Sequence, residues 1–279
     1  MADSSAQDHF APDPAKTYEM PVVFGPALAP DVTHWGGVLL ASASYVTDRA
    51  AAARYVPHHF RLADEAVVNI VRVAYDDVDY IEGSYNEFGV GISVVHDGPE
   101  GPTSGVYYLA MWLDRTEPIT VGRELLGYAK IGGQLPPIVR EGSAASFVVA
   151  DNGQELASGA FEDLTLLDPP RHERLAARFD PSVVLGWKYI PAVGGGADAD
   201  YPTRIPLYFE FDRIWTGAGT VEFASPSQSI PPLSRRILAG LATLPVLEWR
   251  RSFVGEGRGT LPRNQVTRLE SVEREQPTD

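Results

Sequence analysis

Lys130 is the residue whose type and surroundings most directly indicate covalent chemistry. Only three of the 23 lysine and arginine residues are lysines, so a cation needed for charge alone would more often be arginine. Lys130 follows Leu126, Tyr128 and Ala129 and precedes Ile131, an apolar setting. A desolvated lysine can lose its proton and attack a carbonyl carbon to form a Schiff base. The structural alternative is an amphipathic strand or helix end whose lysine reaches out to water.

The stretch that leads to Lys130 carries a motif of its own. Glu117-Pro118 is followed by Val121-Gly122-Arg123-Glu124-Leu125 and then by Tyr128-Ala129-Lys130. This segment, residues 114–130, resembles the nucleophile region of the acetoacetate decarboxylase superfamily, where a Gly-Arg-Glu-rich turn and helix lead into a buried Schiff-base lysine. The resemblance implies that Lys130 is that lysine and that no cofactor is needed. A desolvated lysine nucleophile is known from acetoacetate decarboxylase itself.

Four further segments support the resemblance, which spans roughly residues 35–255. Ser84-Tyr85-Asn86-Glu87 is similar to the family's Tyr-x-Glu segment, whose glutamate lies in the active site. The resemblance therefore implies a site role for Glu87. The other three segments are Val56-Pro57, Trp215-Thr216-Gly217 and Leu244-Pro245-Val246-Leu247-Glu248.

The sequence also departs from the decarboxylase pattern. Decarboxylases carry a second lysine directly after the nucleophile, whereas this chain has Ile131. Two further polar residues of the decarboxylase site, an arginine and a glutamate, lack clear counterparts and fall near Val38 and Arg72. Without a cationic neighbour, burial would have to activate Lys130, and complete desolvation can lower an amine pKa by up to about 3–5 units.

The candidate site has two catalytic residues and four substrate-binding residues. A carboxyl held near an imine can transfer a proton to an enamine, which makes Glu87 a general acid or base beside Lys130. Without the resemblance, Glu87 would be interpreted as a hairpin-loop side chain that faces water. The Arg123 guanidinium could bind a substrate carboxylate, although its helical spacing from Lys130 favours structural pairing for Arg123 or Glu124. The substrate-binding candidates are Arg123, Tyr85, Tyr128 and Glu248.

Composition excludes several classes of function. The net charge of −14 and the pI of about 4.8 disfavour binding to nucleic acid or to an anionic membrane surface. No cysteine is present, so disulfides, thiolate metal sites and thiol nucleophiles are excluded. The start of the chain lacks the basic region and the apolar region that a signal peptide has. No apolar run reaches the roughly 18 residues that a transmembrane helix needs. We expect a cytoplasmic protein.

The sequence gives no indication of a metal or nucleotide site. None of the six histidines has the spacing of a metalloprotease helix. His58 and His59 are expected to point to opposite sides of a strand, and the acidic runs at residues 76–79 and 198–200 lack the calcium-loop pattern. No Gly-Lys-Ser/Thr loop follows the glycine run at residues 194–196.

The pattern along the chain predicts an α+β fold. A mainly antiparallel, barrel-like sheet should enclose a pocket, as the β-cone of the superfamily implies. Helices are expected at residues 48–55, with Thr47 as cap, and at 118–126, 171–179 and 234–242. One domain, residues 17–266, is expected between a disordered tail at 1–16 and a charged tail at 267–279. Strands are expected at residues 21–24, 37–45, 66–75, 88–96, 106–113, 145–150, 184–190, 205–214 and 220–223.

These observations predict a cofactor-independent lyase that forms a Schiff base between Lys130 and a small keto acid or other carbonyl substrate. Either carbon dioxide leaves a β-keto acid, or the enamine reacts with an aldehyde in an aldolase-dehydratase reaction. The alternative from another class is a non-catalytic carrier that binds a small molecule in the same barrel. No nucleic acid or membrane partner is expected, and the resemblance implies a homo-oligomer.

Overall fold

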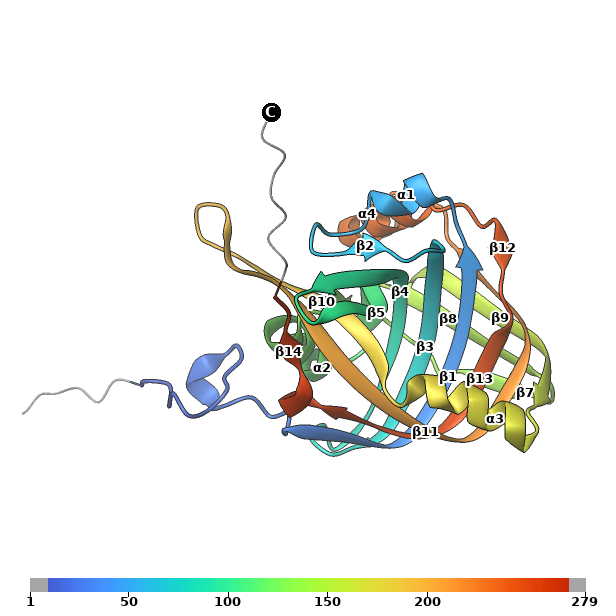
Figure 1. Cartoon of the computed structure of the whole chain (residues 1–279), viewed down its shortest axis with the longest axis horizontal. Coiled ribbons are helices and arrows are strands. Elements are labelled where there is room, and N and C mark those ends of the chain that lie inside the picture. Colours follow the sequence, from blue (N-terminus) through green and yellow to red (C-terminus); the bar gives the residue numbers. More distant parts are fainter. Residues whose placement is uncertain (1–9, 271–279) are drawn as a thin grey trace, which may run out of the picture.

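The computed structural model describes residues 10–270, and one 14-stranded mixed sheet runs through them (Figure 1). The strand order is β10-β5-β4-β3-β1-β13-β11-β9-β8-β7, and β2, β6, β12 and β14 pair beside this path. Neighbours are antiparallel except where β5 pairs with β10 and β6. The bounds are β1 Val32–Val46, β2 Arg61–Leu62, β3 Val67–Val78, β4 Gly83–Gly98, β5 Gly101–Leu113, β6 Lys130–Gly132, β7 Val139–Glu141, β8 Ala144–Asp151, β9 Gln154–Leu166, β10 Ser182–Pro191, β11 Ala197–Phe223, β12 Glu248–Trp249, β13 Ser252–Pro262 and β14 Thr267–Arg268.

The long strand β11 closes the sheet into a ring. Its first part pairs with β10, its middle with β13 and its last part with β9. Because β10 also pairs with β5, the path from β10 through β5, β4, β3, β1, β13 and β11 returns to its start. A strand of 27 residues is long enough to serve three neighbours in turn. Strands β9, β8 and β7 extend the sheet beyond the ring.

Two hydrophobic clusters lie on opposite faces of the ring strands. One cluster contains Trp35, Tyr75, Met111 and Phe209, and strands all around the ring contribute to it, so it fills the interior. The other lies on the outer face and joins β3, β4 and β5 to β8, β9, α1 and α4. Side chains alternate between the two faces along each strand, as the pleat of a strand requires.

Short helices cover the ends of the sheet. Helix α1 begins after Asp48, whose carboxylate accepts a hydrogen bond from Ala51 N at 2.7 Å, and α3 is capped in the same way by Asp168. Within residues 10–270, no helix has the length and apolar character needed to cross a membrane. The helices are η1 Val22–Phe24, α1 Arg49–Ala53, α2 Thr116–Val121, η2 Gly122–Leu126, α3 Pro169–Ala176, η3 Ala177–Phe179, α4 Pro232–Leu241 and η4 Arg263–Gln265.

The predicted fold class is confirmed, with corrections to single elements. The mainly antiparallel, barrel-like sheet and the four predicted helices are present, although helix α1 is capped by Asp48 and not by Thr47. Residues 21–24 were expected to form a strand but form the exposed 3-10 helix η1. Strands β9 and β13 were not predicted, and the expected strands at 205–214 and 220–223 are one strand, β11.

The predicted tails lie partly outside the described residues. Residues 1–9 of the first and 271–279 of the second are not described. Within the described part of the second, Thr267–Arg268 forms β14 and pairs with β11.

Candidate active site

Backbone pairing with the last residues of β5 fixes the position of Lys130. Strand β6 is only three residues long, and its first residue, Lys130, pairs in parallel with Met111 of β5. Met111 N donates to Ala129 O at 3.0 Å, and the Arg123 guanidinium donates to Lys130 O at 3.1 Å. The main chain on both sides of the lysine is therefore held, and only 7% of Lys130 is exposed.

Two glycines in the motif before Lys130 have separate structural roles. Gly122 lies against the lysine side chain: a Cβ there would lie 2.5 Å from Lys130 Cδ and 2.9 Å from Cε. Gly127 has a φ of 89° and ends the π-helical turn η2, where Gly127 N and Tyr128 N both donate to Gly122 O at 2.9 Å. The Gly-Arg-Glu segment thus reverses the direction of the chain. The missing side chain at Gly122 leaves room for the methylene groups of Lys130.

Glu87 lies opposite Lys130 because of the pleat of β4. Tyr85 and Glu87 are two residues apart, so both face the interior, while Asn86 and Phe88 between and after them face outward. Lys130 Nζ and Glu87 Oε2 are 3.0 Å apart, and the two side chains are only 9% and 8% exposed. The two residues that the sequence named as catalytic therefore form a buried ion pair.

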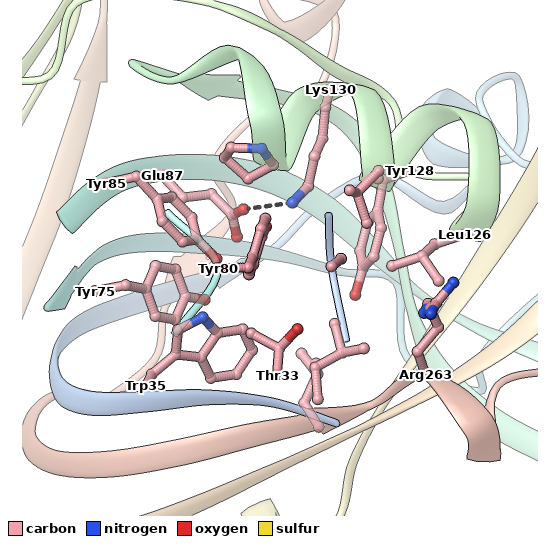
Figure 2. Close-up of a pocket in the computed structure, with 16 residues that line it drawn as sticks. Thr33, Trp35, Tyr75, Tyr80, Tyr85, Glu87, Leu126, Tyr128, Lys130 and Arg263 are labelled. Atoms are coloured by element: carbon pink, nitrogen blue, oxygen red, sulfur yellow. Dashed lines mark ion pairs between the residues drawn. The ribbon is translucent and has the colours of Figure 1, made fainter. Parts of the chain in front are cut away.

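Aromatic side chains form most of the cavity around this pair (Figure 2). The Lys130 amine points toward Glu87 among the rings of Tyr80, Tyr85 and Tyr128, and Tyr75 and Trp35 lie deeper in the wall. Lys130 Nζ lies 4.9 Å from the centre of the Tyr128 ring, a cation–π distance. The Tyr75 and Tyr85 rings stack with centroids 4.6 Å apart, and Tyr75 lies at the same distance from Trp35.

Burial keeps these phenols in the neutral form. The pKa values of Tyr75, Tyr85 and Tyr128 are raised well above the ordinary value, first by desolvation and second by the negative charge of Glu87. The pKa of Tyr80 is raised mainly by the same burial. Neutral tyrosines are hydrogen-bond donors, so the cavity can present O–H groups to an oxygen atom of a bound molecule.

We expect seven of the twelve tyrosines to resist ionisation in the folded protein. Burial raises the pKa of Tyr45 and Tyr107 to about 12 and shifts five others, Tyr75, Tyr80, Tyr85, Tyr108 and Tyr128, in the same direction. A folded-state pKa above the unfolded value stabilises the fold fully below pH ~10 and loses that contribution as pH rises through the folded pKa. Near-ultraviolet absorbance should thus show these phenolates only when circular dichroism reports unfolding. Ionisation of all twelve near pH ~10 in a protein that stays folded would contradict this.

Arg263 is a second cation in the cavity wall, and sequence reasoning did not identify it. It follows β13, and its guanidinium donates to Pro30 O and to Asp31, each at 3.2 Å. Its side chain is 18% exposed, and Figure 2 shows it beyond Leu126 at the edge of the cavity. Tyr75 and Tyr80 were also missed as wall residues, whereas Trp35 was expected in the core or a pocket wall. Tyr75 lies two residues after Val73 in a predicted strand, so both side chains should point to the same face. This period of two was the available signal that Tyr75 faces the interior.

A buried arginine supports β4 from the outer face. Arg72 is fully buried, and its guanidinium donates to Asn86 Oδ1 at 2.9 Å and to the carbonyl oxygens of Val73, Leu135 and Pro136. Burial lowers its pKa to about 10, which leaves it charged near neutral pH. Asn86 in turn donates to Asp114 at 2.8 Å. Arg72 thus faces away from Lys130 and braces the strand that carries Glu87.

Two of the four substrate-binding residues predicted from the sequence, Arg123 and Glu248, lie away from the cavity. The guanidinium of Arg123 holds Lys130 O, and Glu124 accepts from Met20 N at 2.9 Å, so both residues of the motif have structural partners. Glu248 is exposed on β12 and accepts from Arg250. The cavity is not lined by Arg123 or Glu248, whereas Tyr85 and Tyr128 do line it. Ile131, which stands where decarboxylases have a second lysine, packs against the outer cluster.

Comparison with known proteins shows which family this chain resembles in sequence and fold. Residues 19–261 match the sequence profile of the family described as acetoacetate decarboxylase (ADC). Acetoacetate decarboxylase of Burkholderia vietnamiensis is 30% identical over 210 residues, which cover 74% of this chain and 76% of that protein. A structure titled as a study of acetoacetate decarboxylase superposes with a TM-score of 0.75 at 21% identity, over 93% of this chain and 98% of the other.

A second solved structure shows the same fold. The enduracididine biosynthesis enzyme MppR, complexed with pyruvate, has a TM-score of 0.66 at 17% identity, over 91% of this chain and 98% of that one. At these identities the two structures support the fold. The profile match and the Burkholderia relative extend over most of the sequence, including the segments around Glu87 and Lys130. This chain belongs to the acetoacetate decarboxylase family.

Proposed function

We propose that the protein is a lyase that forms a Schiff base between Lys130 and the ketone of a small keto acid. The observation that carries this proposal is the buried Lys130–Glu87 pair, 3.0 Å apart in an aromatic cavity. An amine nucleophile and a proton carrier in direct contact are the two groups that imine chemistry requires. Both come from the chain itself, so the reaction needs no cofactor.

Glu87 prepares the nucleophile and then returns the proton. It accepts a proton from the Lys130 ammonium, and the neutral amine attacks the carbonyl carbon of the substrate. The carbonyl oxygen takes one proton from the attacking nitrogen and one from Glu87 and leaves as water, which gives a protonated imine and restores the Glu87 carboxylate. Neutral Tyr85 and Tyr128 beside the pair can donate hydrogen bonds to that oxygen while it carries developing charge.

The protonated imine promotes decarboxylation because it can accept the electron pair of the breaking bond. In a β-keto acid the bond to the carboxylate breaks, carbon dioxide leaves, and the electron pair moves into the imine to give an enamine. Glu87, after taking a proton from water, delivers it to the enamine carbon, and hydrolysis of the resulting protonated imine releases the ketone and restores the Lys130 ammonium.

We assign substrate binding to Arg263 together with Tyr85 and Tyr128. Arg263 lies on the other side of Tyr128 and Leu126 from Lys130 (Figure 2), and its side chain is 18% exposed, against 9% for Lys130. A guanidinium binds a carboxylate through paired hydrogen bonds, which makes Arg263 the cation of the wall suited to a keto acid's charge. Arg123 and Glu248 are not carried forward as substrate ligands, because Arg123 binds the Lys130 backbone and Glu248 lies on exposed β12.

A second reaction on the same imine is an aldolase-dehydratase reaction. The observation that favours it is Ile131, whose side chain packs on the outer face, so no second amine follows Lys130 into the cavity. The structural neighbour MppR is also described in complex with the condensation product of pyruvate and imidazole 4-carboxaldehyde. In this branch, the enamine of Lys130 attacks an aldehyde and water is then lost.

Proton NMR in deuterium oxide tests these reactions together. The protein is offered acetoacetate alone, pyruvate alone, and pyruvate with an aromatic aldehyde. A decarboxylase converts acetoacetate to acetone and exchanges the methyl protons of acetone. The aldolase-dehydratase branch exchanges the pyruvate methyl protons and forms the condensation product without carbon dioxide. If none of these acids nor a wider panel of ketones reacts or exchanges, the proposal is wrong and the carrier becomes the favoured function.

Replacing Gly122 with alanine should impair turnover more than stability. The new Cβ would lie 2.5 Å from Lys130 Cδ, so the lysine stem must shift and carry its amine away from Glu87. Misplacement of a reacting group by an ångström can lower kcat about 100-fold, whereas the free energy of unfolding should change by only about 1 kcal/mol. The matched control is Gly132→Ala, because a Cβ at Gly132 meets no atom within 4 Å. Equal kcat values for the two variants would contradict this role of Gly122.

A further inference from the structure

Three potential metal ligands meet at a place distinct from the Lys130 cavity. His58 and His59 lie in the turn between α1 and β2, and Asp200 lies on β11. One ligand atom from each residue lies within 4.8 Å of the other two. His58 and Asp200 are exposed, and the side chain of His59 is 10% exposed, so the group opens to solvent on one side.

The expected arrangement of the two histidines was wrong. The sequence analysis placed them on opposite sides of a strand, but Phe60 N donates to Pro57 O at 2.9 Å and turns the chain there. The two imidazole rings consequently lie on the same side, with centroids 3.9 Å apart. The prediction that no metal site exists depended in part on that strand geometry.

The carboxylate of Asp200 is already held in place. Oδ1 accepts a hydrogen bond from Trp187 Nε1 at 2.8 Å and lies 3.0 Å from His59 Nε2. Hydrogen bonds from neighbouring residues to the ligand side chains, such as the one from Trp187, orient the ligands of protein metal sites. The nearby His96 has a different role, since its ring nitrogens contact the carbonyl oxygens of His59 and Glu270 at 3.0 and 2.9 Å.

The distances suit a tetrahedral site that closes around an ion. With metal–ligand bonds of about 2.0–2.1 Å, ligand atoms in a tetrahedral zinc site lie ~3.3 Å apart. His59 Nε2 and Asp200 Oδ1 are already near that separation, at 3.0 Å. Exposed His58 can then complete the group by rotating its side chain. Imidazole and carboxylate ligands suit Zn²⁺, Co²⁺ and Ni²⁺, and three protein ligands leave one position for water.

We propose that His58, His59 and Asp200 bind one divalent transition-metal ion of the zinc class. The ion ties the turn after α1 to β11, two segments that are far apart in the sequence. Strand β10 pairs with β11 beside the site, and Trp187 N on β10 donates to Gly127 O at 3.0 Å. The ion would thus stabilise the strands that support the turn before Lys130, without touching the reacting groups. This proposal is independent of the keto-acid reaction.

Titration of the untagged, chelator-treated full chain with Co²⁺ and then Zn²⁺ tests the proposal. Visible absorption of bound Co²⁺ reports nitrogen and oxygen coordination, and competition with a chromophoric chelator gives the Kd. We expect one ion per chain and a Zn²⁺-induced rise in Tm. His58→Ala and Asp200→Asn should each weaken binding by at least about 100-fold, and Trp187→Phe by about 10–100-fold.

The matched control is His34→Ala. His34 is also an exposed histidine beside a carboxylate, with Nδ1 3.2 Å from Asp79 Oδ2, but among the described residues it belongs to no group of three potential metal ligands. Its removal should leave the stoichiometry, the Co²⁺ spectrum and the Kd unchanged. His58→Ala removes an exposed side chain, so circular dichroism should show an intact fold. Absence of Co²⁺ or Zn²⁺ binding in the wild type would overturn the proposal, as would binding that His58→Ala and Asp200→Asn leave unchanged.

Discussion

Lys130→Arg should lower kcat/KM for the keto-acid substrate by at least about 10⁴-fold, because it removes the nucleophile and keeps the charge. A guanidinium does not lose its proton near neutral pH and cannot form the imine. It can still pair with Glu87, so the buried carboxylate keeps a cationic partner and the fold should persist. Steady-state turnover of the substrate found by NMR gives the loss, and circular dichroism checks the fold.

Lys188→Arg is the matched control for this substitution. Lys188 is another of the three lysines and lies on β10, with Nζ 5.8 Å from the centre of the Tyr201 ring. It does not line the cavity, so its replacement should leave kcat/KM within about twofold, as expected for a surface change. A Lys130→Arg enzyme that keeps wild-type turnover would mean that the reaction does not pass through an imine on this residue.

Glu87→Gln should lower kcat by about 10²–10⁴-fold, the usual range for a general acid or base. Glutamine keeps the size of the side chain but can neither take the Lys130 proton nor return one to the enamine carbon. The loss should appear in kcat more than in KM, since the substrate carboxylate is bound elsewhere. Glu87→Asp should recover part of the rate, because it restores a carboxyl group on the same strand.

Glu248→Gln is the control for the second carboxylate that the sequence suggested. Glu248 is exposed on β12 and pairs with Arg250 at 2.9 Å, so its replacement should leave both kcat and KM unchanged. A loss of turnover in Glu248→Gln similar to that in Glu87→Gln would mean that Glu248 acts in the reaction. An unchanged kcat in Glu87→Gln would instead assign the proton transfers to another group, with the cavity tyrosines as the next candidates.

The sequence named the two proposed catalytic residues more readily than the residues around them. Lys130 was recognised from its rarity, its apolar setting and the glycine motif before it, and Glu87 from a short segment 43 positions earlier in the chain. Neither pattern shows that the two side chains touch. Their contact depends on β6 pairing with β5 and on β5 pairing with β4, which are relations between separate strands.

The walls of the cavity were harder to predict for the same reason. Trp35, Tyr75 and Arg263 come from β1, β3 and η4, and only closure of the ring brings them together. Helical spacing favoured structural pairing for Arg123 or Glu124, and the Arg123 guanidinium does donate to Lys130 O; the substrate role considered for Arg123 came from guanidinium chemistry alone. Ring closure itself depends on the length of β11, which the sequence pattern divided into two shorter strands.

The same limit explains the histidine pair. Val56-Pro57 was identified as a family segment, but the turn that follows it was interpreted as a strand. Side chains at neighbouring positions alternate only in extended chain, so the turn places both imidazoles on one side. Asp200 is 141 positions away from His59 and reaches it through the β10–β11 pairing, which no local pattern reveals.

Intact-protein mass after borohydride reduction tests the central claim, an imine on Lys130, most directly. Acetoacetate and pyruvate are offered separately, and peptide mapping locates any adduct. We predict a reduced adduct on the Lys130 peptide that is absent in Lys130→Arg. An isopropyl group from acetoacetate would show that carbon dioxide had left, and a carboxyethyl group from pyruvate would indicate the aldolase-dehydratase branch. Turnover of either acid without a trapped adduct, or an adduct that persists in Lys130→Arg, would contradict the account.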